Sequence, residues 1–191
     1  MDYTGCTKII MIGGSAGSFP AIERILASLP ETLRACIIII LHRPRNTLSE
    51  MANVLTMAGK HKVTEPEDKE EISDGKIFLV PQNYHMLAEQ DGLLSLDYSE
   101  AELYSRPSIN VIFESFGEIY RQRAAAIILS GLNNDGAEGM AAVVKNGGQG
   151  YIQHPGECEF TVMPEAAKTA NPQTNYYTLH QLINIILNEV N

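Results

Sequence analysis

Ser15, His42 and Asp135 have side chains with complementary chemistry, and each follows shortly after an apolar run (residues 8–13, 35–41 and 124–130). A serine hydroxyl is a weak nucleophile that needs a base within hydrogen-bond reach. Histidine can take the hydroxyl proton and pass it to a leaving group, while a buried aspartate orients the imidazole and stabilises its charged form. The three residue types therefore predict a Ser-His-Asp relay, provided that the fold brings them together.

Each of these residues also has an ordinary structural explanation. The segment GGSAGS at 13–18 fits the G-x-S-x-G pattern, but such segments also bind phosphate or simply turn the chain. His42 can be a strand-end residue bonded to the backbone, and Asp135 in Asn-Asn-Asp-Gly can form an Asx turn and cap a helix. The occurrence of all three at equivalent strand ends favours the catalytic hypothesis.

The elements that must position these residues alternate along the chain. Apolar runs predict strands at residues 8–13, 35–41, 76–80 and 124–130. Helical spacing of apolar residues predicts helices near residues 20–29, 48–55, 109–116, 140–145, 165–169 and 179–190. The segments 84–89 and 93–98, on either side of Gln90-Asp91-Gly92, predict an antiparallel hairpin.

Strands that are apolar throughout and alternate with helices are typical of a parallel sheet covered on both faces. We therefore predict an α/β fold for residues 1–191: a single doubly wound domain with a mostly parallel sheet and the hairpin at one edge. Ligands bind beyond the carboxyl ends of the strands in such sheets, which is where Ser15, His42 and Asp135 are expected. A usual α/β-hydrolase is disfavoured, because its order is serine, acid, histidine.

The composition limits the classes of protein. The chain has 191 residues, 45% of them hydrophobic and 19% charged, which is typical of a globular domain. The net charge of −9 disfavours a general role in binding nucleic acid. The three cysteines without a CxxC pair, the start without a signal peptide and the lack of a long apolar run predict a cytoplasmic protein that is not embedded in a membrane.

No cofactor or metal is expected. His154 and Cys158 are four residues apart, but Pro155 and Gly156 interrupt any helical face and no further ligand pair follows. We interpret His85 in the hairpin as structural. The segment Arg106-Pro107-Ser108 fits both a helix start and a border of the substrate cleft.

Six segments in the same order resemble the catalytic domain of the CheB methylesterases of bacterial chemotaxis: IGGSAGS, LHRP, PQNYHM, YSRPSINVIF, ILSGLNNDGAEGM and VMPEAA. The resemblance runs from about Lys8 to Pro172. It implies hydrolysis of γ-glutamyl methyl esters on the cytoplasmic helices of chemoreceptors, with release of methanol, and deamidation of receptor glutamines. It also implies that Ser15 is the nucleophile, His42 the general base and Asp135 the orienting acid.

The chain departs from the family pattern next to these residues. Ala16 stands where the family usually has threonine. The family loop G-M-G-N-D-G reads GLNNDG at 131–136, so Leu132 replaces methionine and Asn133 replaces glycine. We expect Ala16, Leu132 and Asn133 to form the oxyanion and substrate loop. The resemblance also implies a phospho-receiver domain, which is not expected within residues 1–191.

Two other functions stay open at this point. A non-catalytic regulatory module of the same family could bind a protein helix or a small anion in the cleft, and the substitutions at Ala16 and Leu132 keep this alternative open. The glycines after the first strand suggest a nucleotide-binding domain. However, Gly13, Gly14 and Gly17 do not fit G-x-G-x-x-G, and no P-loop Lys-Ser/Thr follows.

Overall fold

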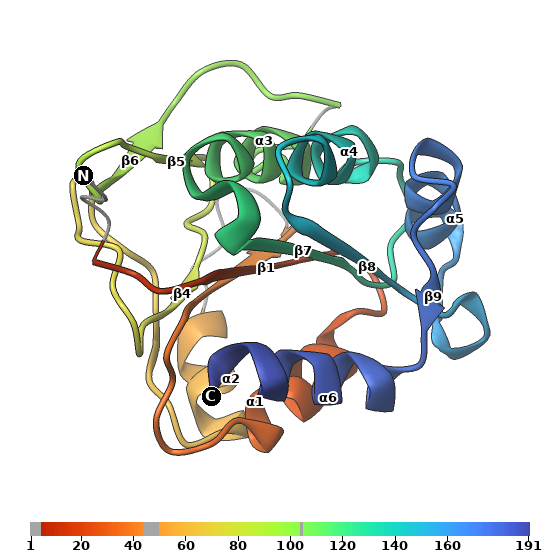
Figure 1. Cartoon of the computed structure of the whole chain (residues 1–191), viewed down its shortest axis with the longest axis horizontal. Coiled ribbons are helices and arrows are strands. Elements are labelled where there is room, and N and C mark those ends of the chain that lie inside the picture. The colour runs from red at the N-terminus through yellow and green to blue at the C-terminus, as the bar shows by residue number, and fades with distance from the viewer. Residues whose placement is uncertain (1–4, 44–49, 104) are drawn as a thin grey trace.

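The computed structural model describes residues 5–43, 50–103 and 105–191. Within these residues, a parallel sheet of seven strands has the order β3-β4-β2-β1-β7-β8-β9 (Figure 1). Its three central strands are β2 (Cys36–Leu41), β1 (Ile9–Gly14) and β7 (Ala124–Ile128). The outer strands are β3 (Val63–Thr64), β4 (Ile77–Leu79), β8 (Gln149–Gln153) and β9 (Tyr176–Tyr177).

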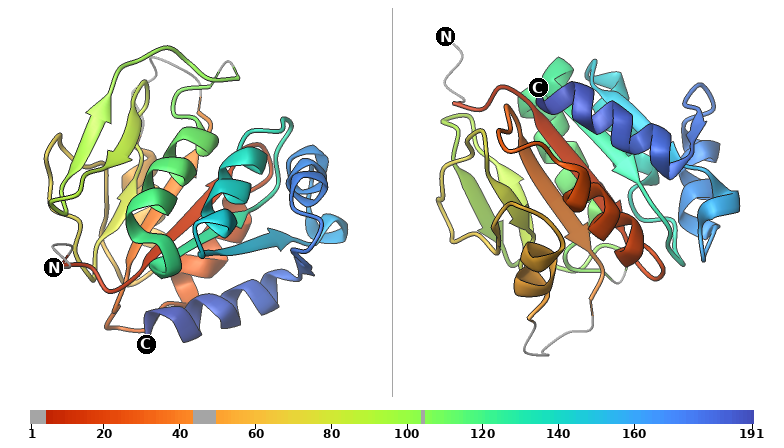
Figure 2. Two further views of the ribbon diagram at one scale, coloured as in Figure 1. Left: turned by 45° about the horizontal axis from the view of Figure 1, so that its top comes forward. Right: turned by 90° about the horizontal axis from the view of Figure 1, so that it is seen from below.

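Helices cover both faces of this sheet (Figures 1 and 2). One face carries α1 (Phe19–Ser28), α2 (Met51–Ala58) and α6 (Leu179–Val190). The other carries α3 (Ile109–Tyr120), α4 (Ala137–Lys145) and α5 (Val162–Ala170). Two short 3-10 helices, η1 (Arg121–Arg123) and η2 (Pro155–Glu157), complete the described elements. The predicted doubly wound α/β fold is confirmed.

The continuous apolar runs of the central strands follow from this double cover. Successive side chains of a strand point to opposite faces, so Ile9 and Met11 of β1 belong to the hydrophobic cluster that contains the buried residues of α3, α4 and α5. Ile10 and Ile12 of the same strand pack against α1 and α6. Because both faces of β1 are buried, no position in it is free to be polar.

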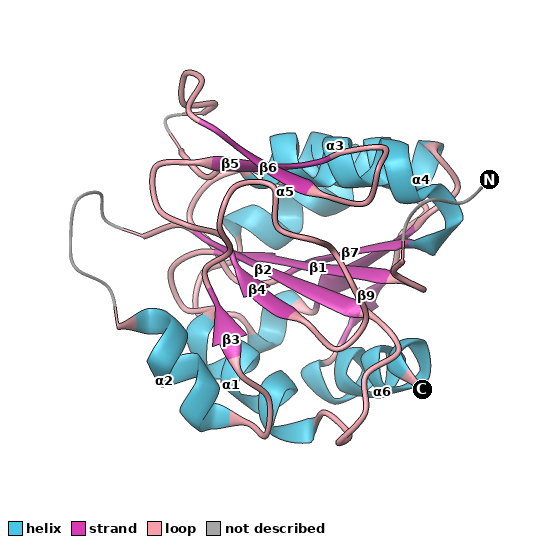
Figure 3. Ribbon diagram, turned by 90° about the vertical axis from the view of Figure 1, so that its left-hand side faces the viewer, coloured by secondary structure: helices cyan, strands magenta, loops and turns pink. Residues whose placement is uncertain are grey.

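The predicted hairpin is present as β5 (His85–Ala88) and β6 (Leu94–Asp97), paired antiparallel. Within the described residues it forms a sheet of its own rather than extending the parallel one. It packs beside α3 (Figure 3), where Met86 and Leu94 join the core and the N–H of Ala88 donates to Ser115 Oγ at 2.9 Å.

Some boundaries differ from the sequence-based expectations. The strands β3, β8 and β9 were not predicted: β3 and β9 have only two residues each, and β8 is buried only at its last two residues and so lacks a continuous apolar run. The predicted helix near 48–55 starts in the structure at Met51, and Leu48, which was assigned to it, lies outside the described residues. The polar segment 65–74 is mainly loop as expected, but Ile72 within it is fully buried.

The order of the strands creates a switch point at β1. The chain leaves β1 to form β2 on one side, and it later returns to form β7 on the other side. In open α/β sheets, the loops that diverge at such a point leave a crevice at the carboxyl ends of the strands. The loops after β1, β2 and β7 are therefore the expected position of a functional site.

Candidate active site

Ser15 and His42 follow neighbouring strands directly. Gly14 of β1 and Leu41 of β2 are register partners, and the N–H of His42 donates to the carbonyl oxygen of Gly14 at 3.2 Å. Neighbouring strands lie about 4.8 Å apart. The sheet register therefore places the hydroxyl and the imidazole within side-chain reach of each other.

The turn that carries Ser15 is fixed on both sides. The N–H of Ser15 donates to the carbonyl oxygen of Ser130 at 3.0 Å, and Ser130 Oγ donates to the carbonyl oxygen of Ala16 at 2.8 Å. Gly17 has a φ of 75°, which favours glycine. A Cβ at Gly17 would lie 2.8 Å from Ser130 Oγ. The glycine thus allows a tight turn between the ends of β1 and β7.

His42 and Asp135 are brought together from positions far apart in the sequence. His42 Nε2 lies 2.7 Å from Asp135 Oδ2, and the Asp135 side chain is 0% exposed whereas that of His42 is 13% exposed. Because an ionised carboxylate only accepts hydrogen bonds, Nε2 carries the proton that is donated to it. The lone pair of the neutral ring is then on Nδ1.

The Asp135 carboxylate sits on the N-terminus of α3. Its Oδ2 accepts from the N–H of Ile109 at 2.7 Å. Its Oδ1 accepts from the N–H of Asn110 at 2.9 Å and from Ser108 Oγ at 3.0 Å. Burial raises the pKa of Asp135, but the hydrogen bonds from His42, Asn110 and Ile109 outweigh burial and lower it below its ordinary 3.8. The carboxylate is therefore ionised at neutral pH.

Two neighbouring helices exchange their capping groups at this site. Asp135 precedes α4 but binds the N-terminus of α3, whereas Asn110 belongs to α3 and binds the N-terminus of α4. The Oδ1 of Asn110 accepts from the N–H groups of Gly136 and Gly139, both at 2.9 Å. Asp135 does cap a helix, but the helix is α3 and not the α4 that follows it, whose N-cap is Gly136 and whose N-terminal N–H groups bind Asn110. The Asx turn of this loop is made by Asn133, whose Oδ1 accepts from the N–H of Asp135 at 3.3 Å.

Ser108 and Asn110 were not predicted as supports of Asp135. The segment Arg106-Pro107-Ser108 was predicted to be a helix start or a cleft border, and Ser108 is indeed the N-cap of α3. His85 is buried and structural as interpreted, because its Nδ1 accepts from the N–H of Ser108 at 3.1 Å and its Nε2 lies 3.1 Å from the carbonyl oxygen of Glu100. No local pattern links these residues to Asp135, since they lie more than twenty positions away.

Two backbone N–H groups in the expected oxyanion loop have no hydrogen-bond acceptor in the described residues. In the described part of the chain, the backbone N–H groups of Ala16 and Leu132 make no hydrogen bond. Leu132 is 57% exposed, so its loop faces solvent. Asn133 contributes its side chain instead: its Nδ2 lies 3.4 Å from His42 Nδ1.

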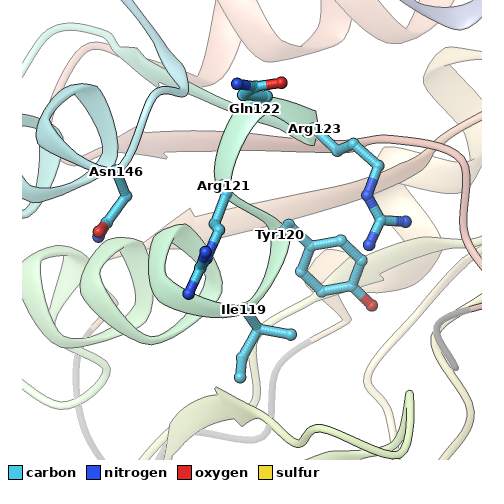
Figure 4. A pocket seen from close by; sticks show the side chains of 6 residues that line it. All are labelled: Ile119, Tyr120, Arg121, Gln122, Arg123 and Asn146. Carbon is cyan, nitrogen blue, oxygen red and sulfur yellow. The ribbon is translucent and has the colours of Figure 1, made fainter. Parts of the chain in front are cut away.

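A cavity of about 570 Å³ lies elsewhere in the molecule (Figure 4). Its lining residues are Ile119, Tyr120, Arg121, Gln122, Arg123 and Asn146. Most of them belong to the end of α3 and to η1, immediately before β7, and so lie at the opposite end of that strand from Asp135. In Figure 4 the Arg121 and Arg123 side chains point in different directions, so the cavity presents no converging set of reactive groups.

The described residues contain no cluster of three or more His, Cys, Asp or Glu side chains that could hold a metal ion. Among the same residues, no helix has the length and apolar character needed to cross a bilayer.

The fold and this arrangement of residues define a doubly wound α/β protein with a serine, a histidine and a buried aspartate at the ends of three adjacent strands. Residues 10–186 match the family model described as CheB methylesterase. The chain therefore belongs to the CheB methylesterase family.

Named relatives and a solved structure agree with this membership. A Leptospira interrogans protein, provisionally named protein-glutamate methylesterase/protein-glutamine glutaminase, is 35% identical over 180 residues, which cover 94% of this chain and 93% of that protein. A Methanosarcina acetivorans protein named for the same two activities is 31% identical over 164 residues, which cover 82% of this chain and 46% of that longer protein. The crystal structure of the Thermotoga maritima CheB methylesterase catalytic domain superposes with a TM-score of 0.88 at 25% identity, covering 95% of this chain and 97% of that one.

Proposed function

We propose that this protein is a serine hydrolase that removes methyl groups from γ-glutamyl methyl esters of proteins and also deamidates protein glutamines. Ser15 is the nucleophile, His42 the general base and Asp135 the orienting acid. The observation that carries these roles is the 2.7 Å contact between His42 Nε2 and the buried Asp135 carboxylate, on a strand end that adjoins Ser15. Family membership and the names of the relatives support the reaction.

The chemistry follows from the ring orientation. Ser15 Oγ attacks the side-chain carbonyl carbon of the substrate while its proton passes to the lone pair on His42 Nδ1. The resulting imidazolium is stabilised by the Asp135 carboxylate. Nδ1–H then protonates the leaving methoxide, which departs as methanol, or the leaving amine, which departs as ammonia. Water, deprotonated by Nδ1, attacks the acyl-enzyme and releases the glutamate carboxylate and the Ser15 hydroxyl.

Negative charge develops on the carbonyl oxygen of the substrate during both attacks. The N–H groups of Ala16 and Leu132 are the donors we assign to this oxygen, because they follow the nucleophile and flank the Asp135 loop without an internal acceptor in the described residues. A backbone N–H does not depend on the side chain. Alanine in place of threonine and leucine in place of methionine therefore leave these donors in place.

We further propose that the protein substrate is the cytoplasmic helical region of a methyl-accepting chemoreceptor, and that the enzyme works in the cytoplasm without a cofactor. Residues 1–191 would act as one catalytic domain, with no receiver domain among them.

The nucleophile assignment is tested by methanol release from a methylated receptor fragment. Ser15→Ala is expected to lower turnover roughly 10⁴-fold to 10⁶-fold, the range found when a triad serine is removed. Ser28→Ala, at an exposed position on α1, serves as the matched control and should keep full turnover. Substantial methanol release by Ser15→Ala would show that another residue is the nucleophile.

A fluorophosphonate probe distinguishes an enzyme from a binding module that uses the same cleft. The probe should label Ser15 covalently in the unaltered protein and fail to label His42→Ala. A folded protein that never reacts with the probe and releases no methanol would overturn the proposed function.

A further inference from the structure

The general base has a second partner besides Asp135. Asn133 Nδ2 lies 3.4 Å from His42 Nδ1, the nitrogen that must accept the proton of Ser15. The resemblance of the sequence to its family places glycine at this position, so the amide is a feature of this chain.

The orientation of the Asn133 amide is set by its other end. Its Oδ1 accepts from the N–H of Asp135 at 3.3 Å, and a backbone N–H can only donate. The NH₂ end of the amide is therefore the end that faces His42. Because Asp135 holds the proton of the ring on Nε2, the ring offers a lone pair on Nδ1 and the amide donates to it.

Two donors thus compete for one lone pair. Within the described residues the Ser15 hydroxyl makes no hydrogen bond, whereas Nδ1 is already in contact with Asn133. A serine that is not bonded to its base keeps its proton and is a poor nucleophile. In the structure the Nδ1 lone pair of His42 therefore faces the Asn133 amide and makes no hydrogen bond with Ser15.

We propose that Asn133 is a positioning residue that latches His42 in the resting enzyme and releases it when a substrate presses on the 131–135 loop. This proposal rests on the proposed function above. Leu132, the residue before Asn133 in the loop, is 57% exposed, so a protein substrate that covers it also moves Asn133. The latch makes the reactivity of Ser15 depend on contact with the loop, which favours large protein substrates over small esters.

The first test measures the rate at which a small fluorophosphonate labels Ser15. In this reaction the Ser15 Oγ–P bond forms, fluoride leaves and the hydroxyl proton passes to His42 Nδ1. The probe is too small to displace the loop, so Asn133→Ala should react roughly twofold to tenfold faster, as expected for losing one neutral hydrogen bond. Asn184→Ala, the same change at an exposed position on α6, should leave the rate unchanged.

Asn133→Asp distinguishes the effect of the hydrogen bond to His42 from the effect of the size of the side chain. A carboxylate has nearly the same shape but cannot donate to the lone pair, and between two carboxylates the ring holds both protons and is lost as a base. Labelling should therefore slow by tenfold or more. With the methylated receptor fragment, which contacts the loop, Asn133→Ala should change kcat/KM by less than it changes the labelling rate. Labelling that slows equally in both Asn133 variants would overturn the latch.

The second test is independent of catalysis. Ring ¹⁵N NMR of His42 should show a protonated Nε2 in both the unaltered protein and Asn133→Ala, since Asp135 sets that tautomer. The Nδ1 resonance should move toward that of an unbonded lone pair only in Asn133→Ala, and Asn184→Ala should leave it in place. An unmoved Nδ1 resonance would end the latch hypothesis even if hydrolysis is confirmed, whereas a moved resonance in a protein that hydrolyses nothing would count against the proposed function alone.

Discussion

At the scale of single residues, Asp135 has the most demanding position. It is a buried carboxylate that is paired with one imidazole and with the N–H groups at the start of α3. Hydrogen bonds to an ionised group are worth more than those between neutral groups. The same carboxylate is therefore expected to serve both the proposed chemistry at His42 and the stability of the helix that it caps.

Replacing the charge of Asp135 is expected to make His42 a poor base although His42 itself is still present. In Asp135→Asn the amide cannot hold the imidazole as the carboxylate does, and the imidazolium loses its counter-charge. We expect kcat for methanol release to fall roughly 10⁴-fold, measured with the methylated receptor fragment. Asp91→Asn in the turn of the hairpin is a suitable control, and similar turnover in both variants would contradict the role of Asp135.

The low pKa of Asp135 predicts how stability depends on pH. The folded value lies below the ordinary 3.8, so the ionised group stabilises the fold at pH values above 3.8, and this stabilisation is lost as the pH falls through the folded value. The gap in unfolding free energy between the unaltered protein and Asp135→Asn should therefore be largest near neutral pH and narrow below 3.8. Urea unfolding followed by circular dichroism measures this gap, and a gap that widens on acidification would contradict the prediction.

The sequence predicted Ser15, His42 and Asp135 as a set because each follows a strand that is recognisable from its apolar run. It could not predict Ser108 or Asn110 as their supports. Those contacts depend on how α3 and α4 pack against each other, which no local spacing encodes.

At the scale of elements, α3 and α4 are joined by their exchanged caps. Asn110 is 3% exposed and its Oδ1 satisfies two N–H groups of the α4 N-terminus. Buried donors that lose their acceptor cost far more than an average hydrogen bond gains. The pairing of the two helices is therefore specific and does not depend on apolar packing alone.

Asn110→Ala should be strongly destabilising for this reason. We expect a loss of about 2–4 kcal/mol in unfolding free energy, and a fall in Tm of several degrees in thermal unfolding. Turnover should also fall, because Gly136 follows Asp135 directly. Asn184→Ala, at an exposed position on α6, should change Tm by less than one degree. Equal Tm values for the two variants would show that the exchange of caps contributes little.

Prediction from sequence was most successful for the buried strands and amphipathic helices, because each presents a long periodic signal. It was least successful for features that depend on tertiary contacts. The hairpin was identified from its turn, but its packing on α3 through Met86 and Leu94 could not be deduced, and the two-residue strand β9 forms only because β8 offers it a partner.

At the scale of the whole molecule, two features act together: the site lies at one end of the sheet, and the chain carries a net charge of −9. A substrate region rich in glutamate would be repelled during approach. This repulsion depends on salt, because the distance over which ions screen charges is about 30 Å at low salt but about 8 Å at physiological salt.

Salt should therefore accelerate the reaction with an acidic substrate. We expect kcat/KM for a methylated peptide with acidic flanks to rise several-fold between low and physiological ionic strength, through faster association. A peptide with the same reactive glutamyl ester and neutral flanks should show little change. A fall in kcat/KM for the acidic peptide would indicate that a local positive surface outweighs the net charge.

Because the Asp135 carboxylate is expected to have two roles, it is a poor position for an inactivating substitution in structural work. Neutralising Asp135 is expected to slow the proposed reaction and also to weaken the cap of α3, so such a variant would be a poor choice for capturing a bound substrate. Ser15 lies on the turn after β1 and its hydroxyl supports no other group in the described structure. Ser15→Ala should therefore give an inactive protein with an unchanged fold, which is suitable for capturing the intact protein substrate.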